Sequence, residues 1–399
     1  MTSKDYIAMD EKFGAHNYHP LPVVIARAEG VHVEDPEGKS YFDFLSAYSA
    51  VNQGHRHPRI INALIDQANV CTLTSRAFHN DRMGLFLKKL CEFSGYEQAL
   101  PMNTGAEAVE TALKAARRWG VEIKGVKNGD QEIICVQENF HGRTLGAITM
   151  SNDPDSRINY GPYVPGFISV PYEDIKAMAA AITPNTVAVI LEPIQGEAGV
   201  CVPYAGYLKE VRELCTKNNV LFICDEVQTG FCRTGKRFAW MHENARPDIM
   251  CLGKALGGGV MPVSAIVADH AVMKVFTPGT HGSTFGGNPL ASAVAMAALD
   301  VLVDEKLDEH AEAMGRIFRE EIGKAACKNM VKVRGKGLLN AILFTEGFDA
   351  WQVCLALRDA GLLAKQTHGN IIRFAPPLVI SEAELRQAIG IIKDVLARY

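Results

Sequence analysis

Short apolar runs alternate with amphipathic stretches through the middle of the chain. Strands are predicted at Glu132–Val136, Val187–Leu191, Val220–Cys224 and Ile249–Leu252. The segment Tyr207–Lys217 places Leu208, Val211 and Leu214 at helical spacing. Alternation of buried strands with such helices predicts an α/β fold, with a mostly parallel central sheet covered by helices on both faces.

The pattern changes after residue 288. Asn288-Pro289, a capping residue followed by a proline suited to a first helical turn, opens an alanine-rich helix expected to end near Val303. Beyond it we expect a helix, a strand at Gly337–Phe344, a helix, a strand at Ile371–Ala375 and a closing helix at Ser381–Arg398. The predicted organisation is therefore an N-terminal segment (1–47), a large domain (48–304) and a smaller α+β C-terminal domain (305–399).

Composition narrows the classes of protein to consider. The chain has 399 residues, of which 48% are hydrophobic and 22% charged, as in ordinary globular proteins of more than one domain. Its net charge of -4 gives no excess of positive charge to attract nucleic acid or an anionic membrane. Neither is therefore an expected partner. No apolar stretch approaches the length of a membrane span.

The cysteines and the first residues bear on the compartment. Ten cysteines are scattered from Cys71 to Cys354 without a C-x-x-C pair or zinc spacing, which is typical of a reducing compartment. Asp10 and Glu11 are acids that a transit peptide would avoid, and no signal-peptide core precedes them. The expected location is the cytoplasm, or the mitochondrial matrix if a transit peptide has been removed.

A lysine and an aspartate each follow a predicted buried strand. Lys254 comes after Ile249–Leu252, and Asp225 comes after Val220–Cys224. Ligands of open α/β sheets collect at the carboxyl ends of strands, so the two side chains are expected to converge. Pyridoxal phosphate (PLP) needs an amine for its aldehyde and an anion beside its pyridine nitrogen. The pair therefore predicts a PLP site, although a lone lysine after a strand is more often a solvated surface residue.

Two turns that combine glycine with polar side chains are candidates to bind the phosphate. In the first, Thr104, Gly105 and Ala106 open a predicted helix, whose free backbone N–H groups suit a phosphate. The alternative is that Thr104 merely caps that helix. The second turn contains Ser283 and Thr284, again hydroxyls and glycines at a helix entry.

Two other patterns are weaker. Gly230–Arg237 nearly matches a phosphate-binding P-loop, but Arg237 stands where a serine or threonine must hold magnesium. His55 and His57 flank one arginine without an accompanying cluster of carboxylates or cysteines, so no metal is expected.

Taken together, these motifs resemble the class III (subgroup II) PLP-dependent aminotransferases, nearly from end to end. The segments that carry the resemblance are Gly14–Pro20, Tyr41–His55, Glu192–Gly199, Asp225–Gly230, Gly253-Lys254, Gly282–Thr284 and Ile371–Pro377. Gly14–Tyr18 and Tyr48–Gln53 are most similar to the members of this family that act on ornithine. The implied fold is that of the fold type I PLP-dependent transferases.

The resemblance implies a role for each cofactor residue. Lys254 would hold the PLP aldehyde and shuttle a proton, and Asp225 would pair with the pyridine nitrogen. The remaining contacts would be Phe140 on the ring face, Gln228 at the ring hydroxyl, Thr104, Gly105 and Ala106 at the phosphate, and Ser283 and Thr284 at the phosphate of a neighbouring subunit. That last contact implies a homodimer. His141, Met261 and Phe285 depart from residues frequent in the family and are expected to tune the pocket without changing a catalytic role.

The resemblance also implies how the substrates bind. Tyr18 and Arg143 would hold the distal α-carboxylate of L-ornithine, and Tyr48 would line the pocket. Arg373 would be neutralised by Glu197 and become free when 2-oxoglutarate, the amino acceptor, needs it. For each arginine the alternative is a structural salt bridge. Among substrates, N-acetylornithine and 4-aminobutyrate are the alternatives to ornithine.

Overall fold

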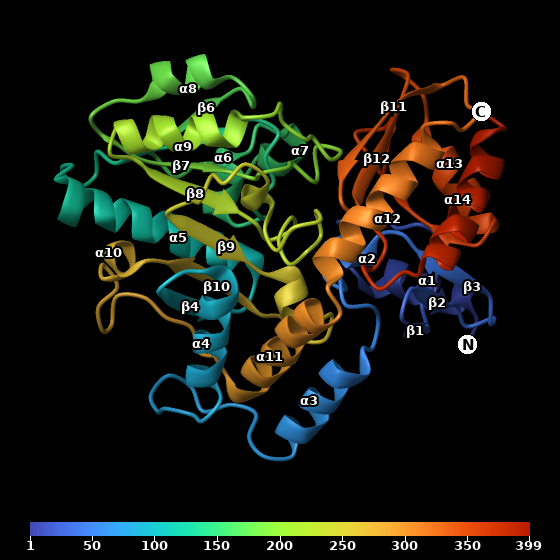
Figure 1. Cartoon of the computed structure of the whole chain (residues 1–399), viewed down its shortest axis with the longest axis horizontal. Helices are drawn as coiled ribbons and strands as arrows, with labels where there is room; N and C mark the ends of the chain where they lie inside the picture. Colours follow the sequence, from blue (N-terminus) through green and yellow to red (C-terminus); the bar gives the residue numbers. More distant parts are fainter.

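The computed structural model describes residues 1–399 and is built around a seven-stranded central sheet (Figure 1). Its strands are β4 (Gln98–Met102), β5 (Glu132–Val136), β6 (Phe167–Val170), β7 (Thr186–Leu191), β8 (Leu221–Asp225), β9 (Ile249–Leu252) and β10 (Ser264–Ala268). They lie in the order β4-β10-β9-β8-β7-β5-β6. The run from β9 to β6 is parallel, and β10 is antiparallel to both of its neighbours. The predicted fold class is confirmed.

Both faces of this sheet are covered, which explains the continuous apolar runs of its strands. Ile133 and Cys135 pack into the layer that contains α5 (Gly105–Trp119). Their neighbours Ile134 and Val136 point to the opposite layer. That layer contains α8 (Ile175–Ala181) and α9 (Tyr207–Lys217).

The C-terminal region forms a second sheet. Its strands, in the order β11-β12-β15-β14, are β11 (Met330–Lys336), β12 (Leu339–Phe344), β15 (Ile371–Phe374) and β14 (Lys365–Thr367). Its helices are α12 (Leu307–Ile322), α13 (Ala350–Asp359) and α14 (Glu382–Leu396). The predicted strand at 337 begins two residues later, because Gly337 has a φ of +52° and turns the chain between β11 and β12.

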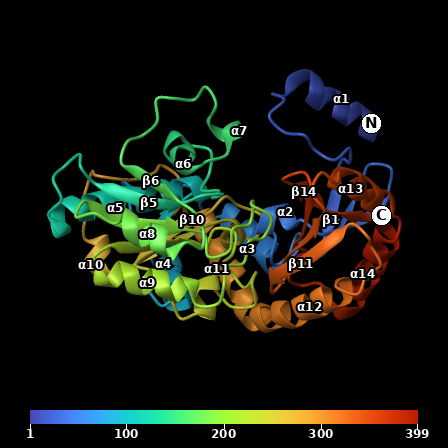
Figure 2. The same cartoon turned by 90° about the horizontal axis from the view of Figure 1, so that it is seen from above.

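The N-terminal segment folds onto this region. The strands β1 (Arg27–Glu29), β2 (His32–Glu34) and β3 (Ser40–Asp43) form a sheet with β13 (Leu362–Leu363). The helix α1 (Ser3–Phe13) has no buried residue and lies away from the body (Figure 2). No pattern near the start of the chain predicted this long-range pairing of β3 with β13.

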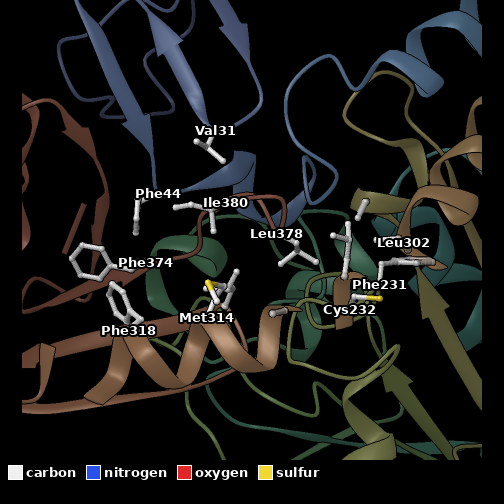
Figure 3. Packing of buried hydrophobic residues seen from close by; sticks show 14 of the residues in the cluster. Val31, Phe44, Phe231, Cys232, Leu302, Met314, Phe318, Phe374, Leu378 and Ile380 are labelled. Atoms are coloured by element: carbon white, nitrogen blue, oxygen red, sulfur yellow. The ribbon is translucent and has the colours of Figure 1, made fainter. Parts of the chain in front are cut away.

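One continuous core joins the two regions. Phe231 and Leu302 from the large region and Phe318 and Phe374 from the small region belong to the same buried cluster (Figure 3). The helix α11 (Pro289–Asp304), capped by Asn288 as predicted, contributes Leu302. The two regions are therefore packed directly against each other.

A buried arginine also bridges the regions. Arg233 is fully buried and donates to Oδ1 of Asn52 and to the carbonyl oxygens of Leu338 and Pro376. The P-loop-like segment 230–237 therefore serves packing, because its central cation is already satisfied by protein oxygens.

The remaining elements are short or peripheral. They are α2 (Ser46–Ser49), α3 (Pro58–Ala68), α4 (Met83–Ser94), α6 (Leu145–Met150), α7 (Pro154–Arg157), α10 (His270–Met273) and three single turns at Gly120–Lys124, Ala239–His242 and Lys254–Gly257. None of the helices is long and apolar enough to cross a membrane. No group of three or more His, Cys, Asp or Glu side chains is placed to hold a metal ion.

Candidate active site

The carboxyl ends of the parallel strands meet at one edge of the central sheet. Phe140 and His141 follow β5, Glu192 follows β7, Asp225 ends β8 and Lys254 follows β9. These residues line a cavity of about 200 Å³ together with Gly105, Ala106, Gly142, Val227 and Gln228. The convergence predicted for Lys254 and Asp225 is thus present in the structure.

Lys254 enters this cavity through an unusual backbone turn. Its φ is +45°, a left-handed conformation that is uncommon for non-glycine residues. At the preceding position, a Cβ on Gly253 would lie 3.3 Å from Cγ1 of Val227. Burial lowers the pKa of the Lys254 amine, and the neighbouring carboxylates of Glu197 and Asp225 offset only part of that effect. A lowered pKa favours the neutral, nucleophilic amine.

Asp225 is held from two sides. Its Oδ1 accepts a hydrogen bond from the Val227 N–H at 3.0 Å, and its Oδ2 lies 2.8 Å from Nδ1 of His141. The side chain of His141 is completely buried. The resemblance did not indicate this contact between His141 and Asp225. A polar side chain next to the expected ring-stacking Phe140 was the available sequence signal, but its contact with β8 depends on tertiary structure.

The first turn of α5 faces the same cavity. Gly105 and Ala106 line it, and their N–H groups have no acceptor within the helix. Thr104 is the N-cap and accepts a hydrogen bond from Glu107, so the alternative capping role is present too. Gly142, with a φ of +123°, approaches this turn so closely that a Cβ there would lie 3.0 Å from Cβ of Ala106.

Two glutamates lie along the segment after β7. The buried carboxylate of Glu192 accepts hydrogen bonds from the N–H groups of Phe140 and Gly196, and burial raises its pKa to about 7. Gln228 packs against Gly196, where a Cβ would overlap its amide. Burial would raise the pKa of Glu197, but the nearby cations, Arg373 foremost, outweigh it and lower that pKa.

Arg373 on β15 reaches from the small region to this site. Its Nη1 lies 2.5 Å from Oε1 of Glu197, and its side chain is only 6% exposed. Its Nε is buried without a hydrogen-bond partner. The guanidinium also lies 5.0 Å from the ring centre of Tyr48, which sits in a turn of four left-handed residues, Ser46–Ser49.

Arg143 and Tyr18 lie farther out. The Arg143 side chain is 62% exposed, lies over the Phe140 ring and donates a hydrogen bond to Ser156. Tyr18 is 81% exposed, yet it adds to the effect of burial in raising the pKa of Tyr48. No contact joins Tyr18 to Arg143. That the two residues bind the same substrate carboxylate therefore stays a prediction.

The turn that contains Ser283 and Thr284 does not enter the cavity of its own chain. Ser283 accepts a hydrogen bond at 2.8 Å from Nδ2 of Asn103, and Thr284 is exposed. Neither residue lines the cavity around Lys254. Their predicted role at a phosphate therefore requires another subunit.

Comparison with known proteins decides the family. The model of the family described as aminotransferase class-III matches residues 13–396. The chain belongs to the class-III aminotransferases. It is 57% identical over 396 residues to the ornithine aminotransferase of Oceanobacillus iheyensis, with 99% of each chain covered.

Two solved aminotransferase structures are similar over the whole chain. The acetylornithine aminotransferase of Elizabethkingia anophelis is 53% identical with a TM-score of 0.92, covering 100% of both chains. An ornithine aminotransferase of Toxoplasma gondii, with partial occupancy of PLP at its active site, is 46% identical with a TM-score of 0.98. It covers 100% of this chain and 94% of the other.

The cavity suits the PLP cofactor on which class-III aminotransferases depend. An amine for the aldehyde and a carboxylate for the ring nitrogen are supplied by Lys254 and Asp225. Unpaired N–H groups at the start of α5 suit the phosphate. The glycine at position 142 leaves the space beside that helix start that a Cβ would fill.

Proposed function

We propose that this class-III aminotransferase moves the δ-amino group of L-ornithine to 2-oxoglutarate, giving glutamate 5-semialdehyde and glutamate. The observation that carries the proposal is the contrast between two arginines. Arg373, beside the cavity, is nearly buried and pairs closely with Glu197. Arg143, at the cavity's outer side, is largely exposed and lies 3.9 Å from the half-exposed carboxylate of Asp153, so solvent weakens that pair. A substrate carboxylate is thereby directed to the outer arginine, and the opposite end of the substrate points to Lys254.

The cofactor, when bound, supplies the electron sink that makes a proton on the carbon next to the substrate's amine removable. Lys254, on the cavity wall with a lowered pKa, is the group that would take that proton and return it to the cofactor. Asp225 would hold the ring nitrogen protonated, and Phe140 would cover the ring face. Gln228 would contact the ring hydroxyl.

Ornithine suits this arrangement because its two functional ends lie far apart. The guanidinium group of Arg143 would bind the α-carboxylate through two parallel hydrogen bonds, with Tyr18 beside it. Tyr48, packed on Arg373, would leave too little room for an α-amine with its carboxylate to enter the inner position. The δ-amine is then the group that reaches Lys254.

The acceptor demands the opposite arrangement. 2-Oxoglutarate carries a carboxylate next to the keto group that must meet the cofactor, so it requires a cation near Lys254. Arg373 would provide that cation after Glu197 turns away. Since the side chain of Glu197 is 29% exposed, it has space to move toward solvent.

Acetylornithine is the alternative donor, in keeping with the similar Elizabethkingia anophelis protein. N-acetylornithine has the same δ-amine and α-carboxylate, so Arg143 would bind both donors. The early segments around Tyr18 and Tyr48 favour ornithine. A donor panel with 2-oxoglutarate as acceptor tests the proposal. We expect the highest kcat/KM with ornithine, whereas higher values with N-acetylornithine or 4-aminobutyrate would reject it.

We also propose that the enzyme works as a homodimer with shared sites. A second cavity of about 370 Å³ adjoins the cofactor cavity and shares Gly105 and Lys254 with it. Ser283 and Thr284 of a partner subunit would reach the phosphate from this side, where Thr104 also lies. All ten cysteines are free, in keeping with the proposed cytoplasmic location.

A further inference from the structure

One residue that lines the cofactor cavity is a buried histidine with one unpaired ring nitrogen. Nδ1 of His141 lies 2.8 Å from Oδ2 of Asp225, and the His141 side chain has no exposed surface. Its Nε2 is buried without a hydrogen-bond partner. Such a residue is unusual, because buried polar atoms are nearly always paired.

The titratable groups that face His141 come from three strand ends. Asp225 ends β8, Glu192 follows β7 and Lys254 follows β9, and all three line the same cavity. The start of α5 brings only Gly105 and Ala106 to it. An ionised carboxylate accepts hydrogen bonds and cannot donate, so Nδ1 must carry the proton in the pair with Asp225.

We propose that His141 is a positioning residue that orients Asp225 toward the cofactor's ring nitrogen and must be neutral when that nitrogen carries its proton. This inference depends on the proposed function in one respect only, namely that the bound cofactor is PLP. Val227 and His141 each hold one oxygen of Asp225, so the carboxylate cannot rotate freely. A protonated ring and a protonated imidazole would be two cations sharing one carboxylate, and the imidazole is the one that can lose its charge at Nε2.

In the cofactor-free protein, the carboxylate of Asp225 stabilises a proton on His141. Burial by itself lowers the pKa of His141, but the hydrogen bond and the charge of Asp225 outweigh burial and raise that pKa above its ordinary value. A cationic ring beside Asp225 lowers it again. PLP binding is therefore coupled to loss of a proton from His141, and it weakens as the pH falls through the pKa of His141 in the cofactor-free protein.

The test compares wild type with His141→Asn and His141→Phe. Asparagine keeps a donor near the Nδ1 position without an ionisable group, and phenylalanine keeps the volume without a donor. The dissociation constant of PLP is measured on cofactor-free protein between pH 5.5 and 8.5 by fluorescence titration. We then divide the PLP dissociation constant of wild type by that of His141→Asn at each pH. This ratio cancels the effects of ionisation of PLP, Lys254 and Glu192, which both proteins share.

We expect this ratio to rise as the pH falls, by up to tenfold per pH unit at the steepest, because one proton is released per site. His141→Phe should weaken PLP binding roughly tenfold or more at every pH, since Asp225 loses a charge-assisted hydrogen bond. His55→Asn is the matched control. Its histidine pairs with Asp43 at the same 2.8 Å, outside the cavity, so its PLP affinity should equal that of wild type.

A flat ratio across the pH range, with His141→Phe within twofold of wild type, would overturn the inference. That outcome leaves the proposed function intact. Failure of wild type to bind PLP, or attachment of PLP to a lysine other than Lys254, would instead reject the proposed function.

Discussion

Removing the carboxylate of Glu197 should redirect the enzyme toward α-amino donors. Loss of one partner from a buried ion pair typically costs about 3–5 kcal/mol. The Glu197 side chain is 29% exposed and that of Arg373 is 6% exposed, so solvent screening reduces the expected cost to about 2–3 kcal/mol. In Glu197→Ala, an incoming carboxylate would replace the missing partner. At 1.4 kcal/mol per tenfold change, its binding should tighten roughly 30- to 150-fold.

The assay is single-turnover conversion of the PLP form to the pyridoxamine phosphate form, with ornithine and with glutamate as donors. The rate ratio of ornithine to glutamate should fall by one to two orders of magnitude in Glu197→Ala. Glu382→Ala is the control, because Glu382 also pairs with an arginine, Arg386, but on the surface. An unchanged ratio in Glu197→Ala would refute the reasoning, and Tyr48 would then be the residue to examine.

Three further outcomes are expected. Asp225→Ala should bind part of its PLP but lose at least a hundredfold in kcat, because an unprotonated ring is a poor electron sink; near-normal turnover would contradict this. Borohydride reduction followed by peptide mapping should place the cofactor on Lys254, and an adduct on any other lysine would contradict the site. Mixing Lys254→Ala with Thr284→Ala chains should restore part of the activity if Thr284 acts across the dimer, since one site of each heterodimer then carries neither change. Verified heterodimers of two inactive parents without recovery would place Thr284 in the site of its own chain.

The central strands were predictable because burial on both faces leaves a continuous apolar signature. The predicted ranges Glu132–Val136 and Ile249–Leu252 agree with β5 and β9 residue for residue, and the helix Tyr207–Lys217 agrees with α9. The convergence of Lys254 and Asp225 followed from the topology, since parallel strands end at one edge. These features depend on local pattern and one general rule of sheet architecture.

Features that depend on long-range packing were not predictable from the sequence pattern. The pairing of β3 with β13 joins residues about 320 positions apart, beyond the reach of any local periodicity. The left-handed turn Ser46–Ser49 contains no glycine to mark it. The contact between His141 and Asp225 arises because β5 and β8 end beside the same cavity, which no spacing in the sequence encodes.

The boundaries proposed at residues 47 and 304 stay predictions. The structure adds that the N-terminal strands belong to the same sheet as β13 of the C-terminal region. It also shows one hydrophobic core running from the large region into the small one. A truncation at residue 47 would therefore expose the small region's sheet and is expected to destabilise the whole chain.

The central claim is that the terminal amine of ornithine, and not its α-amine, is transferred. Ornithine labelled with ¹⁵N at the δ position is incubated with the enzyme and 2-oxoglutarate, and the glutamate formed is analysed by mass spectrometry. We expect ¹⁵N in essentially all of the new glutamate, and none when the label is placed at the α position. Labelled glutamate from α-labelled ornithine, or no transfer from ornithine at all, would contradict it.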